Sequence, residues 1–192
     1  MTHPELVLQM AQYLDTAGIP FMIAGSVCSS SWSMPRSTND VDIVIEATFA
    51  QVEHFFSLLG DRYYFSLDMA REGLAQESMF NIIDFASGVK VDLIPRKSRP
   101  FDIEQFQRRI PRPLKGRAVP MASAEDVILA KLEWNKITPS ERQIRDVQEV
   151  AKAQWPTLDV AYLRKWASEL GVVAELEEVL RIAEAGQERP KA

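Results

Sequence analysis

The sequence has a single cysteine, Cys28, and only two histidines, His3 and His54. A lone thiol excludes an internal disulfide, and with no second thiol or histidine at ligand spacing it does not predict a metal site. The histidines lack the partner spacing that is typical of a zinc site or a catalytic triad. We therefore expect Cys28 to act as a small filler residue and give neither histidine a chemical role.

Long hydrophobic runs are also missing from the sequence. No stretch approaches the roughly 20 apolar residues that a membrane-spanning helix requires. The start, MTHPELVLQM, has an acidic residue and no basic segment before its apolar positions, so we expect no secretory signal. With the single cysteine, these features predict a cytoplasmic protein without a membrane partner. The 192 residues, 46% of them hydrophobic, suit one domain, or one domain with a helical extension.

The net charge of −5 is distributed unevenly along the chain. Residues 96–117, here named the basic segment, hold eight Lys and Arg residues against Asp102 and Glu104. Their local net charge is +6, which leaves −11 for the rest of the chain. Such asymmetry predicts a polyanionic partner. A solvated loop that its three prolines keep extended explains the same composition equally well.

Local patterning predicts helices and strands in the first part of the chain. Helices are expected at 4–17, closed by Gly18, and at 49–59, with Thr48 as N-cap and Gly60 at the end. Strands are expected at 21–24, 41–45 and 62–66, followed by a hairpin of 79–86 and 89–94 joined at Ser87 and Gly88.

From Ser123 onward the pattern becomes helical. Ser123 with Asp126, and Ser140 with Gln143, predict two capped helix starts, and Trp155-Pro156 separates the second helix from two more at 158–170 and 172–185. We therefore expect a core of residues 1–122 and a C-terminal helical region of residues 123–192.

Two carboxylates interrupt the apolar run DVDIVI at residues 40–45. Side chains alternate along a strand, so Asp40 and Asp42 share one face while Val41, Ile43 and Ile45 lie on the other. Two rises of about 3.3 Å place the two aspartate Cα atoms roughly 6 to 7 Å apart. Both carboxylates would repel each other in a dry site without a cation, and carboxylate oxygens with open positions are the ligands that Mg²⁺ prefers.

A third acidic residue lies in the hairpin. In its second strand the same alternation puts Lys90, Asp92 and Ile94 on one face. Asp84 on the partner strand competes for this role, but it falls in register with Phe80 and Ile82, and we rank it below Asp92.

A Gly-Ser turn precedes these carboxylates. Gly25 and Ser26 directly follow the strand FMIA, where glycine lets backbone N–H groups approach phosphates and serine adds a hydroxyl. A helix over VCSSSWS would add its N-terminus to the turn. The order of these parts predicts a metal-dependent site for a phosphate chain, although each part alone is weak.

These residues resemble the DNA polymerase beta-type nucleotidyltransferase superfamily. Its signature is a hydrophobic strand, Gly-Gly or Gly-Ser, about a dozen residues, and D-x-D or D-x-E in a second strand, which IAGS and DVDIVI match. PRSTNDVD resembles the R-x-T-x-D-x-D variant of the minimal and abortive-infection branches, which include toxins of toxin–antitoxin pairs. The resemblance covers residues 5–152, and VPMASAEDVILAKLEWNK with RQIRDVQEV is similar to that branch's helical segment, with Lys131, Arg145 and Asp146.

The resemblance implies an α/β (α+β) fold with a mixed sheet flanked by helices and a helical C-terminal region. It implies that Asp40, Asp42 and Asp92 hold two Mg²⁺ ions, with Mn²⁺ as an alternative, while an acceptor hydroxyl attacks a nucleoside triphosphate. We expect Gly25, Ser26, Arg36 and Lys131 to contact the triphosphate. For Lys131, pairing with Glu133 or Asp126 is an equally good explanation, and Arg145 and Asp146 are interpreted as structural.

The acceptor and the partners are less closely defined by the sequence. We expect an RNA end, such as a tRNA 3′ end, to bind through residues 96–117, and a cognate antitoxin protein to be a further partner. One alternative is a catalytically silent module that binds a nucleotide or a partner protein. Another is a metal-dependent nuclease or phosphohydrolase, which would also use clustered aspartates. Metal-dependent release of pyrophosphate would separate transfer from both.

Overall fold

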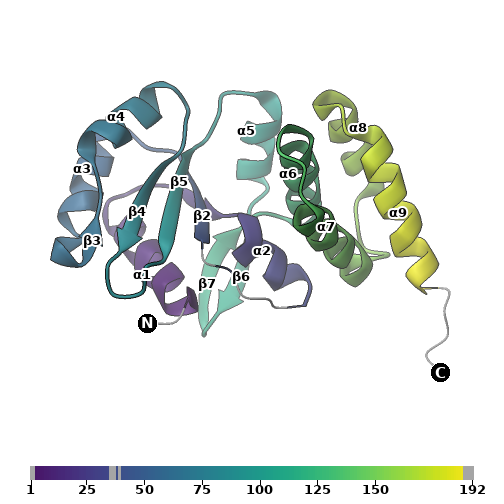
Figure 1. The fold of residues 1–192 in the computed structure, drawn as a ribbon, viewed down its shortest axis with the longest axis horizontal. Helices are drawn as coiled ribbons and strands as arrows, with labels where there is room; N and C mark the ends of the chain where they lie inside the picture. The colour runs from purple at the N-terminus through teal and green to yellow at the C-terminus, as the bar shows by residue number, and fades with distance from the viewer. Residues whose placement is uncertain (1–2, 35–37, 39, 188–192) are drawn as a thin grey trace. The chain divides into compact units, whose positions relative to one another are not determined.

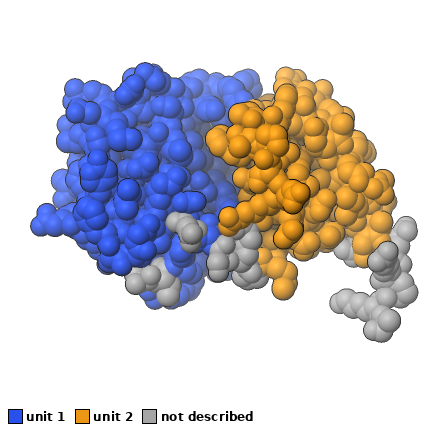
Figure 2. All heavy atoms as spheres, viewed as in Figure 1, with its two compact units in different colours: residues 1–27, 37–122 blue, residues 28–36, 123–192 orange. Residues whose placement is uncertain are grey.

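The computed structural model describes residues 3–34, 38 and 40–187. Contacts divide the chain into two compact units, one of residues 1–27 and 37–122 and the other of residues 28–36 and 123–192 (Figure 2). Within the described residues, no helix combines the length and apolarity that a membrane crossing needs. Each unit is described below by itself.

The first unit is built on a seven-stranded mixed sheet with the order β3-β4-β5-β2-β1-β7-β6 (Figure 1). The pairs β2–β5 and β1–β7 are parallel, and the other neighbours are antiparallel. This confirms the α/β fold with a mixed sheet. The strands are β1 (Phe21–Ile23), β2 (Asp40–Ile45), β3 (Tyr63–Tyr64), β4 (Phe80–Asp84), β5 (Lys90–Pro95), β6 (Ile110–Leu114) and β7 (Arg117–Met121).

Helices flank this sheet, and their apolar faces form its core. In α1 (His3–Thr16), Leu6, Met10 and Leu14 recur every four residues, lie on one helix face and are almost completely buried. The helix α3 (Phe49–Ser57) has Thr48 as its N-cap, with the capping box that the sequence predicts. Gly60 is the first residue of a short 3-10 turn. The other helices are α4 (Leu67–Ala75), α5 (Pro100–Gln107) and α2 (Gly25–Trp32). In sequence, α2 runs from the first unit into the second.

The basic segment is not the extended loop that we considered as one explanation. Its first part forms α5, with Pro100 at the first helical position. An N–H at that position makes no hydrogen bond within the helix, so proline costs none. Its second part forms the hairpin of β6 and β7, with Pro111 and Pro113 in the edge strand β6. An edge strand tolerates proline because one of its sides has no ladder hydrogen bonds to lose. The prolines therefore sit at the permitted positions of regular elements.

The second unit consists of helices. Ser123 Oγ accepts the N–H of Asp126 at 3.1 Å and donates to its carboxylate at 2.8 Å, so the predicted cap of the first helix is confirmed. Ser140 is the N-cap of the second helix, as predicted, but its side chain makes no capping hydrogen bond, and its own N–H donates to Asn135 Oδ1. The helices are α6 (Ala124–Ile137), α7 (Glu141–Gln154), α8 (Val160–Leu170) and α9 (Val173–Gln187).

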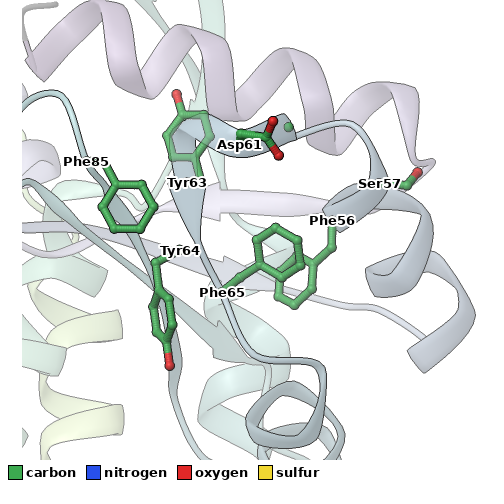
Figure 3. Close-up of a pocket in the computed structure, with 8 residues that line it drawn as sticks. Phe56, Ser57, Asp61, Tyr63, Tyr64, Phe65 and Phe85 are labelled. Carbon is green, nitrogen blue, oxygen red and sulfur yellow. The ribbon is translucent and has the colours of Figure 1, made fainter.

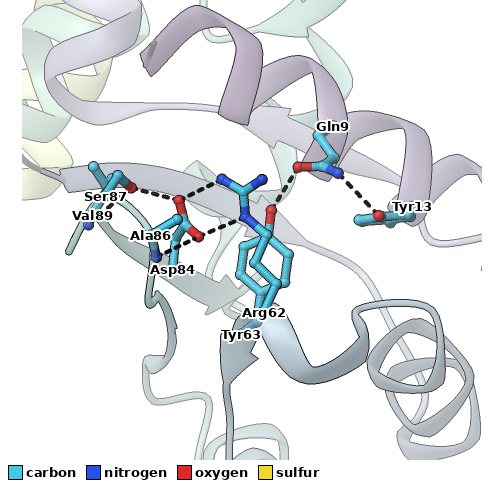
Figure 4. Close-up of polar contacts among 8 residues, drawn as sticks. All are labelled: Gln9, Tyr13, Arg62, Tyr63, Asp84, Ala86, Ser87 and Val89. Carbon is cyan, nitrogen blue, oxygen red and sulfur yellow. Dashed lines mark hydrogen bonds and ion pairs between the residues drawn. The ribbon is translucent and has the colours of Figure 1, made fainter. Parts of the chain in front are cut away.

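An ion pair between a buried aspartate and a partly exposed arginine lies at one end of the β4–β5 hairpin. Asp84 is completely buried and receives two hydrogen bonds from the Arg62 guanidinium, at 2.7 and 2.9 Å (Figure 4). The same carboxylate accepts the Ser87 hydroxyl at 2.6 Å and the Ala86 N–H at 3.3 Å. These bonds, the one to Arg62 first, lower the pKa of Asp84 to about 2. Asp84 therefore has a structural partner set, in agreement with its lower rank as a metal ligand.

The ion pair predicts a specific acid sensitivity. Because the pKa of Asp84 is about 2 in the folded protein and near 3.8 in an unperturbed aspartate, the contribution of Asp84 to stability is complete above about pH 4 and is lost as pH falls toward 2. We expect Asp84→Asn to lower the free energy of unfolding by roughly 2 to 4 kcal/mol at pH 7, since Arg62 loses its charged partner. Urea unfolding across pH 2 to 7 measures both effects. Asp61→Asn, an exposed carboxylate beside Arg62, is the control, and equal losses in both variants at pH 7 would contradict the prediction.

Candidate active site

Two neighbouring parallel strands bring four charged residues to one face of the sheet. Asp40 of β2 is in register with Lys90 of β5, and Asp42 with Asp92. Because side chains alternate along both strands, these four project to the same face as a two-by-two grid. The opposite face carries the fully buried side chains of Val41, Ile43, Val91 and Leu93. The apolar face thus holds the register that places the charges together.

Asp92 is the most enclosed carboxylate of the grid. It is only 4% exposed, and its Oδ2 lies 2.9 Å from the Lys90 ammonium. Its Oδ1 is buried and has no hydrogen-bond partner among the described residues. A buried carboxylate oxygen without a donor loses its hydration without compensation, so this atom is poised for a cation or a proton donor.

Lys90 lies within the field of all three aspartates. Its hydrogen bond to Asp92 raises the pKa of the Lys90 ammonium, and the charges of Asp92, Asp40 and Asp42 raise it further, against the opposing effect of burial. The ammonium therefore stays charged. The sequence placed Lys90 on the correct face but gave it no role, because strand parity alone does not show that β5 lies beside β2.

Asn81 is a polar neighbour that sequence reasoning missed. It pairs with Asp92 across the β4–β5 hairpin and is partly buried, so the row Asn81–Asp92–Asp42 crosses three strands. The predicted hairpin did not supply this pair, because counting outward from a turn at Ser87 and Gly88 places residue 83 opposite residue 92, and the observed register differs from that by two residues. Asn81 brings an uncharged amide to the edge of the grid.

Gly25 packs directly against Asp42. Its φ of +56° lies in the left-handed region, and a Cβ atom added there would be 1.8 Å from Asp42 Oδ2 and 2.5 Å from its Cγ. The preceding Ala24 N–H donates to the Asp42 carbonyl at 2.9 Å and extends the β1–β2 pairing to this point. Only glycine satisfies both the backbone angle and the space. Gly25 and Ser26 also form the start of α2.

The other predicted triphosphate contacts are Arg36 and Lys131. Arg36 lies outside the described residues. Lys131 belongs to the second unit, where its ammonium donates to Gln143 at 2.7 Å and forms a buried ion pair with Asp146 at 2.9 Å. Its partner is therefore Asp146, and the suggested pairing with Glu133 or Asp126 is wrong. The interpretation of Asp146 as structural agrees with this buried pair.

The three aspartates provide the donor chemistry that a divalent cation needs. Asp40, Asp42 and Asp92 share one face, and Asp92 Oδ1 has no donor of its own. Among the described residues, no group of three His, Cys, Asp or Glu side chains converges closely enough to hold an ion as the side chains stand. Oxygen ligands on adjacent strands fit Mg²⁺ or Mn²⁺, which keep several water ligands of their own.

The cations of the basic segment are divided between the two ends of the strands. The row Ile43–Ile23–Met121–Ile110 links the neighbouring strands β2, β1, β7 and β6. Arg109 directly precedes Ile110 as Asp42 precedes Ile43, so Arg109 and Asp42 lie at the same end of the strands. Three strand spacings separate these positions by about 14 Å. Four of the eight cations form ion pairs, Arg96–Glu46, Arg99–Asp102, Lys115–Glu5 and Arg117–Asp15. The exposed positive charge is smaller than the composition indicates.

A separate aromatic hollow lies at the β3 edge of the first unit. Its volume is about 510 Å³, and Phe65, Tyr64 and the largely exposed Phe85 converge on it together with Asp61 (Figure 3). Its lining includes none of the predicted site residues.

Comparisons with known proteins identify the fold. No protein-family model matches the sequence, and no curated protein sequence is detectably similar. A solved antigenic nucleotidyltransferase-like protein from Paracoccidioides brasiliensis aligns with a TM-score of 0.60 and 18% identity over 93% of this chain and 92% of that chain. The chain thus has the fold of nucleotidyltransferase-like proteins.

Two structures of antibiotic-related transferases have the same fold. ANT(2")-Ia, solved in complex with adenylyl-2"-tobramycin, aligns with a TM-score of 0.53 and 19% identity over 97% of this chain and 98% of that chain. The lincosamide antibiotic adenylyltransferase LnuA, solved with lincomycin bound, aligns with a TM-score of 0.53 and 16% identity over 78% of this chain and 96% of that chain. At these identities the similarity concerns the fold.

The contact between Gly25 and Asp42 can be tested with a matched pair of substitutions. Gly25→Ala should displace the Asp42 carboxylate and abolish divalent-ion binding, because the new methyl group would occupy the position of Asp42 Oδ2. Gly88→Ala is the control, since Gly88 has φ of +70° and nothing within 4 Å of its added Cβ, so it shares the backbone strain alone, about 1 kcal/mol. Thermal melting and Mn²⁺ titration measure both effects. Equal behaviour of the two variants would remove Gly25 from the site.

Proposed function

We propose that this chain is a metal-dependent nucleotidyltransferase that moves a nucleoside monophosphate from a nucleoside triphosphate to an acceptor hydroxyl. The observation that carries the proposal is the register of Asp42 with Asp92 on parallel strands, beside a glycine turn that packs against Asp42. The buried, unpartnered Oδ1 of Asp92 adds a carboxylate oxygen that needs a ligand. The fold shared with nucleotidyltransferase-like proteins supports the same reaction class.

The proposed metal ligands are Asp40, Asp42 and Asp92, with Mg²⁺ or Mn²⁺ in a two-ion arrangement. When bound, the ions supply positive charge to the attacking and leaving oxygens of an in-line displacement. Asp40 is exposed and Asp42 is partly buried, so both can reach a ligand from solvent, while Asp92 is almost completely buried. As the resemblance to the nucleotidyltransferase superfamily implies, Asp40 and Asp42 would hold metal on the nucleotide side and Asp92 on the acceptor side.

The chain's own groups bind, orient and deprotonate the reactants in this proposal. Asp92 Oδ1 accepts the proton of the acceptor hydroxyl, because it is the carboxylate oxygen with no other donor. The hydroxyl oxygen forms a bond to the α-phosphorus, the bond to the bridging oxygen breaks, and pyrophosphate departs. Backbone N–H groups at Gly25 and Ser26 hold the β- and γ-phosphates at the start of α2.

Arg36 and Lys131 are proposed as further triphosphate contacts. Both are cations that would balance the charge of a triphosphate. The Lys131 ammonium already donates to Asp146 and Gln143, which leaves one of its three protons for a phosphate oxygen. Asp146 and Gln143 would then fix the direction of that proton.

The acceptor remains a prediction with two candidates. An RNA end, such as a tRNA 3′ end, is supported by the position of Arg109 at the same end of the strands as Asp42. A small hydroxylated molecule is the second candidate, because ion pairs with acidic residues reduce the free positive charge of the basic segment. ANT(2")-Ia and LnuA, with tobramycin and lincomycin in their structures, support the second candidate through the shared fold.

Two further hypotheses concern regulation and loss of activity. A cognate antitoxin protein would make this chain the toxin of a toxin–antitoxin pair, and co-expression with the neighbouring gene product would relieve growth arrest. The alternative to transfer is a silent module that binds a nucleotide or a partner. Three charged positions held together without a reaction would be costly to keep, which favours transfer.

The central test is nucleotide transfer by Asp42→Asn. We expect loss of at least a hundredfold in label transfer with an intact fold, because removing one negative charge weakens metal binding and relieves repulsion among the aspartates. The assay incubates each α-labelled nucleoside triphosphate with Mg²⁺ and cell extract, then separates RNA, protein and small molecules and measures pyrophosphate. Asp61→Asn is the matched control. Unchanged transfer by Asp42→Asn at saturating Mg²⁺ would refute the assignment.

The RNA acceptor is tested by replacing Arg108, Arg109 and Arg112 with Gln. We expect weaker RNA binding and a flatter salt dependence, because each neutralised single-strand phosphate contributes a log–log slope of about −0.7. Triphosphate binding should not change. The control is Lys115→Gln with Arg117→Gln, two cations at the other end of the strands that are paired with Glu5 and Asp15. Label found only on small molecules would show that RNA is not the acceptor.

A further inference from the structure

We propose that Lys90 is a tethered counter-ion that competes with divalent metal for Asp92, so that the enzyme without nucleotide binds metal weakly. This inference rests on the proposed function, because it concerns the same metal site. Lys90 acts through Asp92 and is therefore a positioning residue.

The position of the Lys90 ammonium carries the inference. It lies 2.9 Å from Asp92 Oδ2, and its own Cα is in register with that of Asp40. The strand register thus places one cation at a corner of the grid whose other corners are Asp40, Asp42 and Asp92. Because Oδ1 is the oxygen proposed to accept the proton of the acceptor hydroxyl, Oδ2 is the oxygen that is left for a metal ion, and the Lys90 ammonium occupies it.

The electrostatics of the grid require such a cation. Three ionised carboxylates on two adjacent strands repel one another, and Asp92 is only 4% exposed, so water screens it poorly. Lys90 reduces the grid charge from −3 to −2 and supplies a hydrogen bond to the most buried member. Lys90 therefore offsets part of the repulsion among the aspartates before any metal arrives.

The same arrangement makes metal binding conditional. A metal ion that takes Asp92 Oδ2 must displace the Lys90 ammonium, which loses its bond and meets a like charge. The Lys90 side chain is 39% exposed, so it has water to move into. The triphosphate carries about four negative charges, which would compensate the charges of the metal ion and of the Lys90 ammonium. Metal occupancy should therefore rise together with nucleotide binding.

The test compares Mg²⁺ binding to the nucleotide-free protein across three variants. Lys90→Met should lower the melting temperature without metal, tighten the Mg²⁺ dissociation constant roughly tenfold, and enlarge the stabilisation by Mg²⁺, since a half-exposed charge is partly screened. Lys90→Arg keeps the charge and should stay within about threefold of the wild-type Mg²⁺ dissociation constant. The control is Lys97→Met, because Lys97 is an exposed lysine that does not belong to the grid.

The outcomes separate this inference from the proposed function. If the wild type binds Mg²⁺ and transfers nucleotide but Lys90→Met binds Mg²⁺ no more tightly, the counter-ion role is overturned and the transferase remains. If neither the wild type nor Lys90→Met binds Mg²⁺ or transfers nucleotide, both proposals fall together.

A second measurement covers the case in which Lys90→Met does not fold. The Lys90 ammonium signal in nitrogen-15 spectra of the wild type is identified by its loss in Lys90→Arg. We expect Mg²⁺ without nucleotide to shift or broaden this signal as the ammonium leaves Asp92. A Lys90 signal that is unchanged at saturating Mg²⁺ would overturn the inference.

Discussion

The parallel pairing of β2 with β5 is the interaction on which the candidate site depends. Neither strand carries a complete site, because β2 supplies two carboxylates and β5 supplies one carboxylate and one ammonium. The pairing is held by the buried opposite face, where a slip by one residue would turn Asp42 or Asp92 into the core. Hydrophobic packing therefore keeps like charges together against their mutual repulsion.

The neighbouring strands complete this arrangement. β1 is antiparallel to β2 and ends beside Asp42, which brings the glycine turn against that carboxylate. β4 is antiparallel to β5 and brings Asn81 beside Asp92. At the far end of the same hairpin, Arg62 neutralises Asp84. The hairpin thus contains one aspartate whose hydrogen bonds are satisfied within the fold and one with an oxygen left open.

Local elements were predictable from the sequence because local rules define them. The strand at Asp40–Ile45, the hairpin, and the caps at Thr48 and Ser123 follow from alternation and capping residues. The proximity of Lys90 to three aspartates was not predictable, since it depends on a pairing between strands about 50 residues apart. The prolines of the basic segment suggested an extended loop, but they occupy a helix start and an edge strand, where proline is tolerated.

The edge strand β6 also limits how copies of this protein can associate. Pro111 and Pro113 have the same parity along the strand, so both lack an N–H on the same side, the side that faces away from β7. A foreign strand aligned there would find no donors at two of five positions, and the opposite edge, β3, offers only two residues. Both borders of the sheet therefore resist strand addition and the growth of fibrils. Self-association would have to proceed through side-chain surfaces.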